Sequence, residues 1–212
     1  GKRMAVGAYL NDGKGGNSGH VRVFEFDEDS QYWIQLGNDL DGEASHDYSG
    51  ASVSLSGDGN IVAIGAYGND GEFDATRNAG HTRVYGFFEN NNQWYQIGND
   101  IDGKKNGDFF GSTVSLSLNG RVLAIGAILE DEKGDASGAV YIYRYAHQSG
   151  WEIVNKLKGE KEGELFGSSL SLSSDGLRIA VGSYHHDGEV NSSGPVNVFE
   201  FNEIQQKYNK LG

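Results

Sequence analysis

The sequence contains no cysteine, one proline and one methionine among its 212 residues. Without cysteine, the chain can form no disulfide and can offer no thiolate as a nucleophile or metal ligand. No apolar run approaches the ~20 residues of a membrane-spanning helix, so insertion into a membrane is not expected. Cationic residues are scarce, 17 against 30 acidic ones. The resulting formal net charge of −13 disfavours nucleic acid as a partner, because binding to phosphates requires clustered lysine and arginine.

Glycine, by contrast, is abundant, with 33 residues against a usual share of roughly 7%. Glycine adopts positive φ without strain, so this abundance predicts many tight turns. The segments between the glycines are rich in β-branched and aromatic residues, which favour strands. The composition therefore predicts an all-β fold.

The chain repeats itself four times. One marker series, Gly7, Gly65, Gly126 and Gly182, advances in steps of 58, 61 and 56 residues. Three further series keep the same period: Gly19, Gly80, Gly138 and Gly194; Trp33, Trp94, Trp151 and Tyr208; and Val-Ser-Leu-Ser or its variant at Val53, Val114 and Leu170. Each unit holds about four strand-like segments, which is typical of the blades of a β-propeller.

We therefore expect residues 1–212 to form a single β-propeller repeat array of about four four-stranded antiparallel blades. The units are approximately 1–47, 48–108, 109–164 and 165–212, and the first lacks its first strand. Because propellers close to protect their edges, we expect the array to be part of a longer protein. The alternatives are a ring of four blades within this chain, or two chains that pair to give eight blades.

The third segment of each unit indicates how the blades pack. Valine or another β-branched residue alternates there with aromatic residues, as in Val140, Ile142, Tyr143 and Tyr145. Since successive side chains of a strand point to opposite faces, both faces of the sheet are apolar and need a neighbour. We expect Tyr143 to lie between adjacent blades.

Short motifs resemble a known repeat. Phe110-Gly111-Ser112 and Phe166-Gly167-Ser168, and less closely Tyr48-Ser49-Gly50, precede Val-Ser-Leu-Ser and Ile-Gly-Ala or their variants. In this the chain resembles the FG-GAP repeats that build the integrin α-subunit propeller. The resemblance implies an extracellular or cell-surface propeller that binds a protein or a glycan, as in cell adhesion. The family also includes propellers attached to enzymes.

The chain departs from that family at two points. Where the family usually has Gly-Ala-Pro, the chain has Gly-Ala-Tyr at 7–9 and 65–67. Integrin repeats often carry an aspartate-rich calcium loop between their first and second strands. Here a short Asp-Gly or Asn-Gly turn takes its place, so calcium is not expected at that family position.

Calcium is the cofactor that the sequence suggests, at residues other than those of the integrin calcium loop. Asp39 and Asp41, and likewise Asp100 and Asp102, stand two apart before a glycine, as in part of a calcium loop. The first ligand and the final glutamate of the loop template are missing, so turn aspartates in water are the alternative. His20 and His81 begin third segments and are read as ordinary edge positions. The segment 185–187, His-His-Asp, is a weaker candidate for a transition metal.

Catalysis is not expected. A nucleophile would need an adjacent base at one unique place, whereas the serines of this chain recur in every unit. The sequence therefore predicts a protein that is not an enzyme.

In an antiparallel blade, the loops from the second to the third strand and from the fourth to the next first strand emerge at the same end. These long loops hold twenty acidic and seven basic residues, which accounts for the whole charge excess. We expect this acidic end to be the binding face, with the following candidates: Asp12, Asp70, Asp74, Asp131, Asp135 and Asp187. Long solvated loops also collect aspartate for turn formation alone, which is the alternative.

These patterns favour a binding or adhesion module that recognises a protein or a glycan. Two alternatives stay open. One is a structural repeat of a large extracellular assembly, with self-association through blade edges. The other is the accessory propeller of an enzyme.

Overall fold

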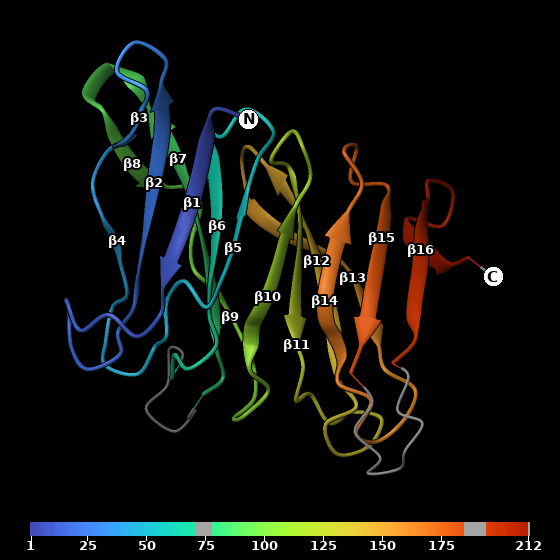
Figure 1. The fold of residues 1–212 in the computed structure, drawn as a ribbon. Helices are drawn as coiled ribbons and strands as arrows, with labels where there is room; N and C mark the ends of the chain where they lie inside the picture. Colours follow the sequence, from blue (N-terminus) through green and yellow to red (C-terminus); the bar gives the residue numbers. More distant parts are fainter. Residues whose placement is uncertain (71–77, 185–193, 212) are drawn as a thin grey trace.

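The computed structural model describes residues 1–70, 78–184 and 194–211. Four antiparallel sheets stand side by side, and each is one of the expected blades (Figure 1). The predicted all-β propeller architecture is confirmed. Among the described residues the only helical turn is η1 (Glu89–Asn91), and no helix is long and apolar enough to cross a membrane.

The blades follow one another along the chain. Blade 1 consists of β1 (Arg3–Ala8), β2 (His20–Asp27), β3 (Tyr32–Gln35) and β4 (Leu40–Asp41). Blade 2 consists of β5 (Ser52–Leu55), β6 (Ile61–Ala66), β7 (His81–Phe88), β8 (Gln93–Gln96) and β9 (Ile101–Asp102). Blade 3 consists of β10 (Phe110–Leu116), β11 (Val122–Ala127), β12 (Ala139–Ala146) and β13 (Gly150–Lys158). Blade 4 consists of β14 (Phe166–Leu172), β15 (Arg178–Ser183), β16 (Val196–Asn202) and β17 (Lys207–Lys210). Neighbours in sequence are neighbours in each sheet, except that β4 and β9 pair with β2 and β7.

Two of the marker glycines are required where adjacent blades meet. A Cβ atom on Gly65 would lie 2.0 Å from the carbonyl oxygen of Gly111 in the next blade. Gly7 meets the carbonyl oxygen of Gly50 at the same 2.0 Å. No side chain fits at such a distance, so the glycines of the Ile-Gly-Ala and Phe-Gly-Ser motifs permit direct backbone contact between blades.

The two serines of Val-Ser-Leu-Ser have different structural roles. The hydroxyls of Ser54 and Ser115 accept hydrogen bonds from the backbone N–H groups of Leu116 and Leu172, at 2.9 and 3.0 Å. Each bond crosses to the edge strand of the next blade, where the sheet itself supplies no partner on that side. The second serine closes a hairpin: Ser56 accepts from the N–H of Ile61 at 3.0 Å. These contacts support the expected structural role of the repeated serines.

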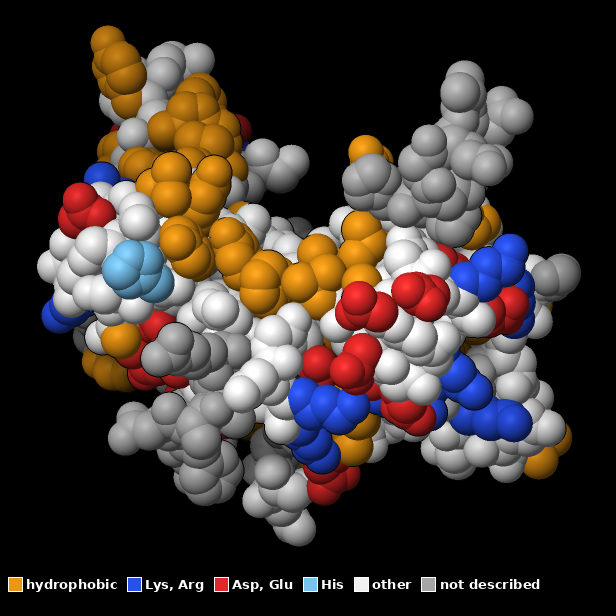
Figure 2. Space-filling view, turned by 90° about the horizontal axis from the view of Figure 1, so that it is seen from below, with side chains coloured by type: hydrophobic (Ala, Val, Ile, Leu, Met, Phe, Trp, Pro, Cys, Tyr) orange, Lys and Arg blue, Asp and Glu red, His pale blue; other side chains and the backbone are white. Residues whose placement is uncertain are grey.

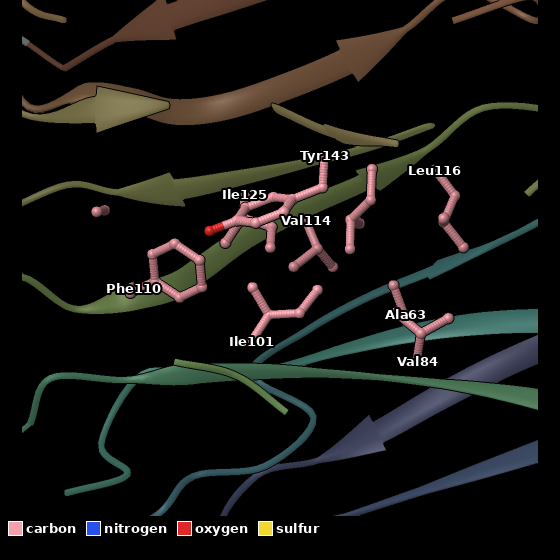
Figure 3. Packing of buried hydrophobic residues seen from close by; sticks show 10 residues of the cluster. Ala63, Val84, Ile101, Phe110, Val114, Leu116, Ile125 and Tyr143 are labelled. Carbon is pink, nitrogen blue, oxygen red and sulfur yellow. The ribbon is translucent and has the colours of Figure 1, made fainter. Parts of the chain in front are cut away.

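The core lies between blades rather than inside one. Figure 3 shows Tyr143, Phe110 and Val114 from blade 3 in one cluster with Ile101, Ala63 and Val84 from blade 2. Tyr143 is only 9% exposed and meets the ring of Phe110 edge-on at 6.5 Å. The expectation that Tyr143 lies between blades is confirmed. An isolated blade would leave this surface in water, so the repeats stabilise one another.

Replacing Gly65 with alanine tests the contact between blades. We expect Gly65→Ala to lower the free energy of unfolding by more than about 2 kcal/mol, because the new methyl group must push two backbones apart. Gly16→Ala is the control, since Gly16 is exposed and a Cβ there meets no atom within 4 Å. Urea unfolding followed by tryptophan fluorescence measures both. Equal stability of the two variants would show that the blades do not touch at Gly65.

Candidate functional site

The long loops gather at one end of the blades, the lower end in Figure 1, as expected. They are joined to one another by backbone hydrogen bonds. The N–H of Tyr48 donates to the carbonyl of Asn17, and that of Ser49 to Ser18, at 3.1 and 3.0 Å. Figure 2 views this end directly and shows a continuous band of hydrophobic side chains with acidic side chains beside part of it. We call this end the loop face.

Four aromatic rings form a continuous row on the loop face. Tyr48 and Tyr67 stack with centroids 5.2 Å apart and planes 12° from parallel. Tyr9 lies 6.5 Å from Tyr48, and Phe109 lies 5.2 Å from Tyr67. We call Tyr9, Tyr48, Tyr67 and Phe109 the aromatic row. It crosses from blade 1 through blade 2 to the start of blade 3.

The glycine contacts between blades place these rings together. Tyr67 comes two residues after Gly65, and Phe109 comes two residues before Gly111, so the contact of the two glycines sets the rings side by side. Tyr48 and Phe109 hold left-handed backbone, with φ of 54° and 55°. Such φ values cost a residue with a side chain roughly 1–2 kcal/mol. The surrounding backbone contacts therefore hold the rings in a strained but fixed position.

A groove of about 380 Å³ runs along the aromatic row. Its walls are formed by the following residues: Tyr9, Ala51, Tyr67, Phe109, Ser112 and Ile128. Tyr9 is 44% exposed. Burial, and then the neighbouring Tyr48 and Tyr9, raise the pKa of the Tyr67 hydroxyl, which stays protonated as a hydrogen-bond donor. The groove thus offers aromatic faces with hydroxyl groups at their edges.

Sequence reasoning missed the aromatic row. The signal was present, because tyrosine at 9 and 67 occupies the position where the resembled family has proline. In two successive repeats an aromatic residue replaces the proline of the family. That replacement could have identified the row.

A second pocket, of about 830 Å³, lies over the outer strands of blade 2. It contains Glu43, His81, Asp100 and Asp102, which we call the His81 cluster. His81 Nδ1 is 3.9 Å from Glu43 Oε2 and 3.9 Å from Asp102 Oδ1. Gln96 donates a hydrogen bond of 2.6 Å to Asp100. The structure therefore brings two of the four predicted aspartate ligands together with His81, which the sequence placed at an ordinary edge position, and Glu43, which it did not single out.

The interpretation of His81 as an ordinary edge residue is wrong, since the residue is only 1% exposed. Burial, and then the charge of Arg83, lower the pKa of His81 to about 4, so its imidazole is neutral at pH 7. Its Nε2 atom has no hydrogen-bond partner in the described part of the chain. Burial also raises the pKa of Glu43, against the effect of Arg83.

Blade 1 contains the equivalent group: His20, Asp39 and Asp41. His20 is also buried, so its interpretation as an edge residue is wrong as well. Here, however, Asp39 already has a cationic partner. Arg22 donates two hydrogen bonds to its carboxylate, at 2.9 and 2.7 Å, and these lower the pKa of Asp39.

The other candidates of the acidic face have local partners where the structure describes them. Asp12 accepts a hydrogen bond from the N–H of Asn17 at 2.8 Å, and Asp70 from that of Asn78 at 3.0 Å. Asp131 pairs with Lys105 at 3.1 Å, and the carbonyl of Asp135 accepts the N–H of Gly163 at 2.8 Å. The remaining candidates, Asp74 and Asp187, lie outside the described residues, as do His185 and His186. A binding role for this set stays a prediction.

Asp108 lies in the loop before β10 and is buried, with 5% exposure. Burial, followed by the charge of Glu130, raises the pKa of Asp108 to about 6, while Lys105 opposes the shift. Its carboxylate therefore titrates close to neutral pH.

Comparison with known proteins identifies the repeat. Residues 40–85 and 101–143 match the family model described as FG-GAP repeat. No curated protein matches the chain. The resemblance to FG-GAP repeats seen in the sequence is thus confirmed over these residues.

Several solved structures share the fold. A protein from Bacteroides uniformis ATCC 8492 assigned as a 6-phosphogluconolactonase is 12% identical, with a TM-score of 0.59 over 98% of this chain and 53% of its own. One from Bacteroides fragilis NCTC 9343 with the same assignment is 12% identical, with a TM-score of 0.56 over 99% and 52%. The Pseudomonas aeruginosa periplasmic gluconolactonase is 15% identical, with a TM-score of 0.56 over 97% and 52%. The chain spans about half the length of these structures.

These neighbours overturn one prediction. The sequence predicted that the chain is not an enzyme, because its candidate nucleophiles recur in every unit. The solved structures with this fold are named as lactonases, so the prediction is contradicted. The reasoning failed because repeated serines say nothing about residues that occur in one blade only.

The elevated pKa of Asp108 leads to a prediction about stability. A carboxyl group whose pKa is raised on folding stabilises the folded state at low pH, and that contribution is lost as pH rises through about 6. We therefore expect Asp108→Asn to gain stability relative to the parent chain between pH 4 and 7, by on the order of 2–3 kcal/mol. Urea unfolding at intervals of pH measures the difference.

Asp175→Asn serves as the control. The hydrogen bond from the hydroxyl of Ser173 lowers the pKa of this exposed aspartate, opposite in direction to the shift of Asp108. A relative gain of equal size in both variants would show that burial of Asp108 is not its cause.

Proposed function

Because the chain contains FG-GAP repeats arranged as propeller blades, we propose that it is a binding module that recognises a glycan along the aromatic row of its loop face. The observation that carries the proposal is the row itself: four rings in contact, of which Tyr9, Tyr67 and Phe109 line an open groove. Exposed apolar surface of this kind on a folded domain usually marks an interaction site.

The chemistry of the row suits sugars. The C–H faces of a pyranose ring pack against aromatic rings, while its hydroxyl groups form hydrogen bonds with polar groups at the ring edges. The groove provides both, through Tyr9, Tyr67 and Ser112. Its rings are already fixed in the free protein, so little conformational entropy is lost when a ligand binds. The small volume of the groove, about 380 Å³, favours an oligosaccharide over the broad surface of a protein partner.

Charge narrows the class of glycan. The net charge of the chain is −13, so a sulfated or uronic acid chain would be repelled. We expect neutral or amino-bearing glycans to bind. The FG-GAP repeats support an extracellular or cell-surface location for this binding, and adhesion as its biological context.

A second candidate is action on a sugar lactone, by this chain or by an enzyme of which it is an accessory propeller. The names of the three solved structures favour it. The test is hydrolysis of glucono-δ-lactone, followed by acid release at pH 7. If the rate of hydrolysis at high protein concentration equals the spontaneous rate, the chain itself does not hydrolyse the lactone.

Glycan binding can be tested directly. The chain is applied to an array of neutral, amino-bearing and sulfated oligosaccharides, and the best ligand is measured by calorimetry. We expect Tyr67→Ala and Phe109→Ala each to weaken binding at least tenfold, because each removes a ring that lines the groove. Tyr32→Ala is the control, since Tyr32 is 73% exposed and lies in β3, away from the row.

Two results would contradict the proposal. One is the absence of any binding to neutral or amino-bearing glycans by a folded chain. The other is a ligand whose affinity falls equally in Tyr32→Ala and Tyr67→Ala.

A further inference from the structure

The His81 cluster joins two blades. Glu43 belongs to the loop that follows blade 1, whereas His81 begins β7 and Asp102 ends β9 in blade 2. Glu43, His81 and Asp100 each offer a ligand atom, and these atoms lie within 4.8 Å of one another. Three groups that commonly bind metals thus converge on one pocket from two structural units.

The buried imidazole is the second, independent observation. Each nitrogen of an imidazole carries either a hydrogen or a lone pair, and Nε2 finds no hydrogen-bond partner in the described structure. Nδ1 faces carboxylate oxygens at 3.9 Å, which is too far for a hydrogen bond. If Nδ1 instead presents its lone pair, that pair faces negatively charged oxygens. A positive ion between them resolves the conflict.

The distances agree with a shared ion. Two ligand atoms that each lie about 2.0–2.3 Å from one ion are roughly 3–4 Å apart. The two separations of 3.9 Å fall at the upper end of this range. Small rotations of the carboxylates of Glu43 and Asp100, whose ligand atoms lie within 4.8 Å of that of His81, would complete the contact.

The equivalent positions of blades 1 and 3 do not gather carboxylates around an imidazole in the same way. In blade 1 the guanidinium of Arg22 neutralises Asp39. In blade 3 the strand pairing places Ala139 opposite Lys158, where blade 2 has His81 opposite Asp102. In blade 2, Arg83 contacts the carbonyl of Asp41 and Glu43 Oε1. Asp100 accepts a hydrogen bond from Gln96 instead.

We propose that Glu43, His81 and Asp100, supported by Asp102, bind a divalent first-row transition metal ion such as zinc, which links the loop after blade 1 to blade 2. A ligand set of one imidazole and two or three carboxylates is typical of zinc and its neighbours, whereas calcium takes oxygen ligands only. The site differs from the calcium loop expected of the aspartates alone, and it does not depend on glycan binding.

The test uses the untagged chain and zinc itself. Calorimetry of the metal-free chain should show one zinc ion bound, and a hundredfold excess of calcium should not displace it. Asp100→Asn should weaken zinc binding at least tenfold, and His81→Gln should weaken it more. Because Asp100 is exposed, its variant should fold even if replacement of the buried His81 disturbs folding. X-ray absorption at the zinc edge should show one imidazole nitrogen together with oxygen ligands.

His20→Gln is the matched control, since it makes the same change in the equivalent group of blade 1. Its zinc affinity should equal that of the parent chain. Absence of zinc binding, zinc affinity unchanged by Asp100→Asn, or equal loss in His20→Gln and His81→Gln would each overturn the proposal. So would displacement of zinc by calcium.

Discussion

The contact between the backbones of Gly65 and Gly111 is the constraint on which the rest of this structure depends. A carbonyl oxygen lies where a side chain on Gly65 would begin, so two blades approach as closely as backbone allows. At that distance the hydroxyl of Ser54 can reach the N–H of Leu116 in the next blade. The edge strand is satisfied, and the apolar faces that meet behind it exclude water. Glycine thus determines the spacing, and serine and the core follow from it.

This constraint explains what the sequence could and could not predict. The strands, their order and the position of Tyr143 follow from local periodicity and from repetition, so each could be predicted from short segments. The contacts within the aromatic row could not, although the tyrosines at 9 and 67 mark two of its members in the sequence. Tyr9 and Tyr48 are far apart in sequence and meet only because two blades touch. The left-handed backbone of Tyr48 has no sequence signature, because residues with a side chain rarely adopt it.

Only part of the His81 cluster could be predicted, because its members come from two repeat units. Asp100 and Asp102 stand in a recognisable motif, but their partner Glu43 comes from the preceding unit. The position equivalent to Glu43 at the next junction is Lys104, so no repetition drew attention to it. The argument that excluded catalysis failed at this point too: it considered residues that every blade shares, whereas function in a repeat protein resides in the residues that one blade alone carries.

The acidic charge of the loop face also separates into different uses. Several carboxylates replace missing backbone partners, as when Asp47 accepts the N–H groups of Glu43 and Ala44 at 3.1 and 2.8 Å. Buried Glu130 is neutralised by Lys156 at 2.8 Å. These contacts leave the formal excess of −13 unchanged. The excess therefore selects against anionic ligands, while affinity for the others depends more on shape than on net charge.

One loop connects the two candidate sites. Residues 42–50 carry Glu43 at one end and Tyr48 near the other, and Asp47 holds the two halves together from a nearly buried position. The aromatic row lies over the inner strands β5 and β6 of blade 2, whereas the His81 cluster lies over its outer strands β7 and β9. The sites can therefore be filled at the same time. Because Asp47 already holds this loop in the free protein, an ion bound at Glu43 need not change the position of Tyr48.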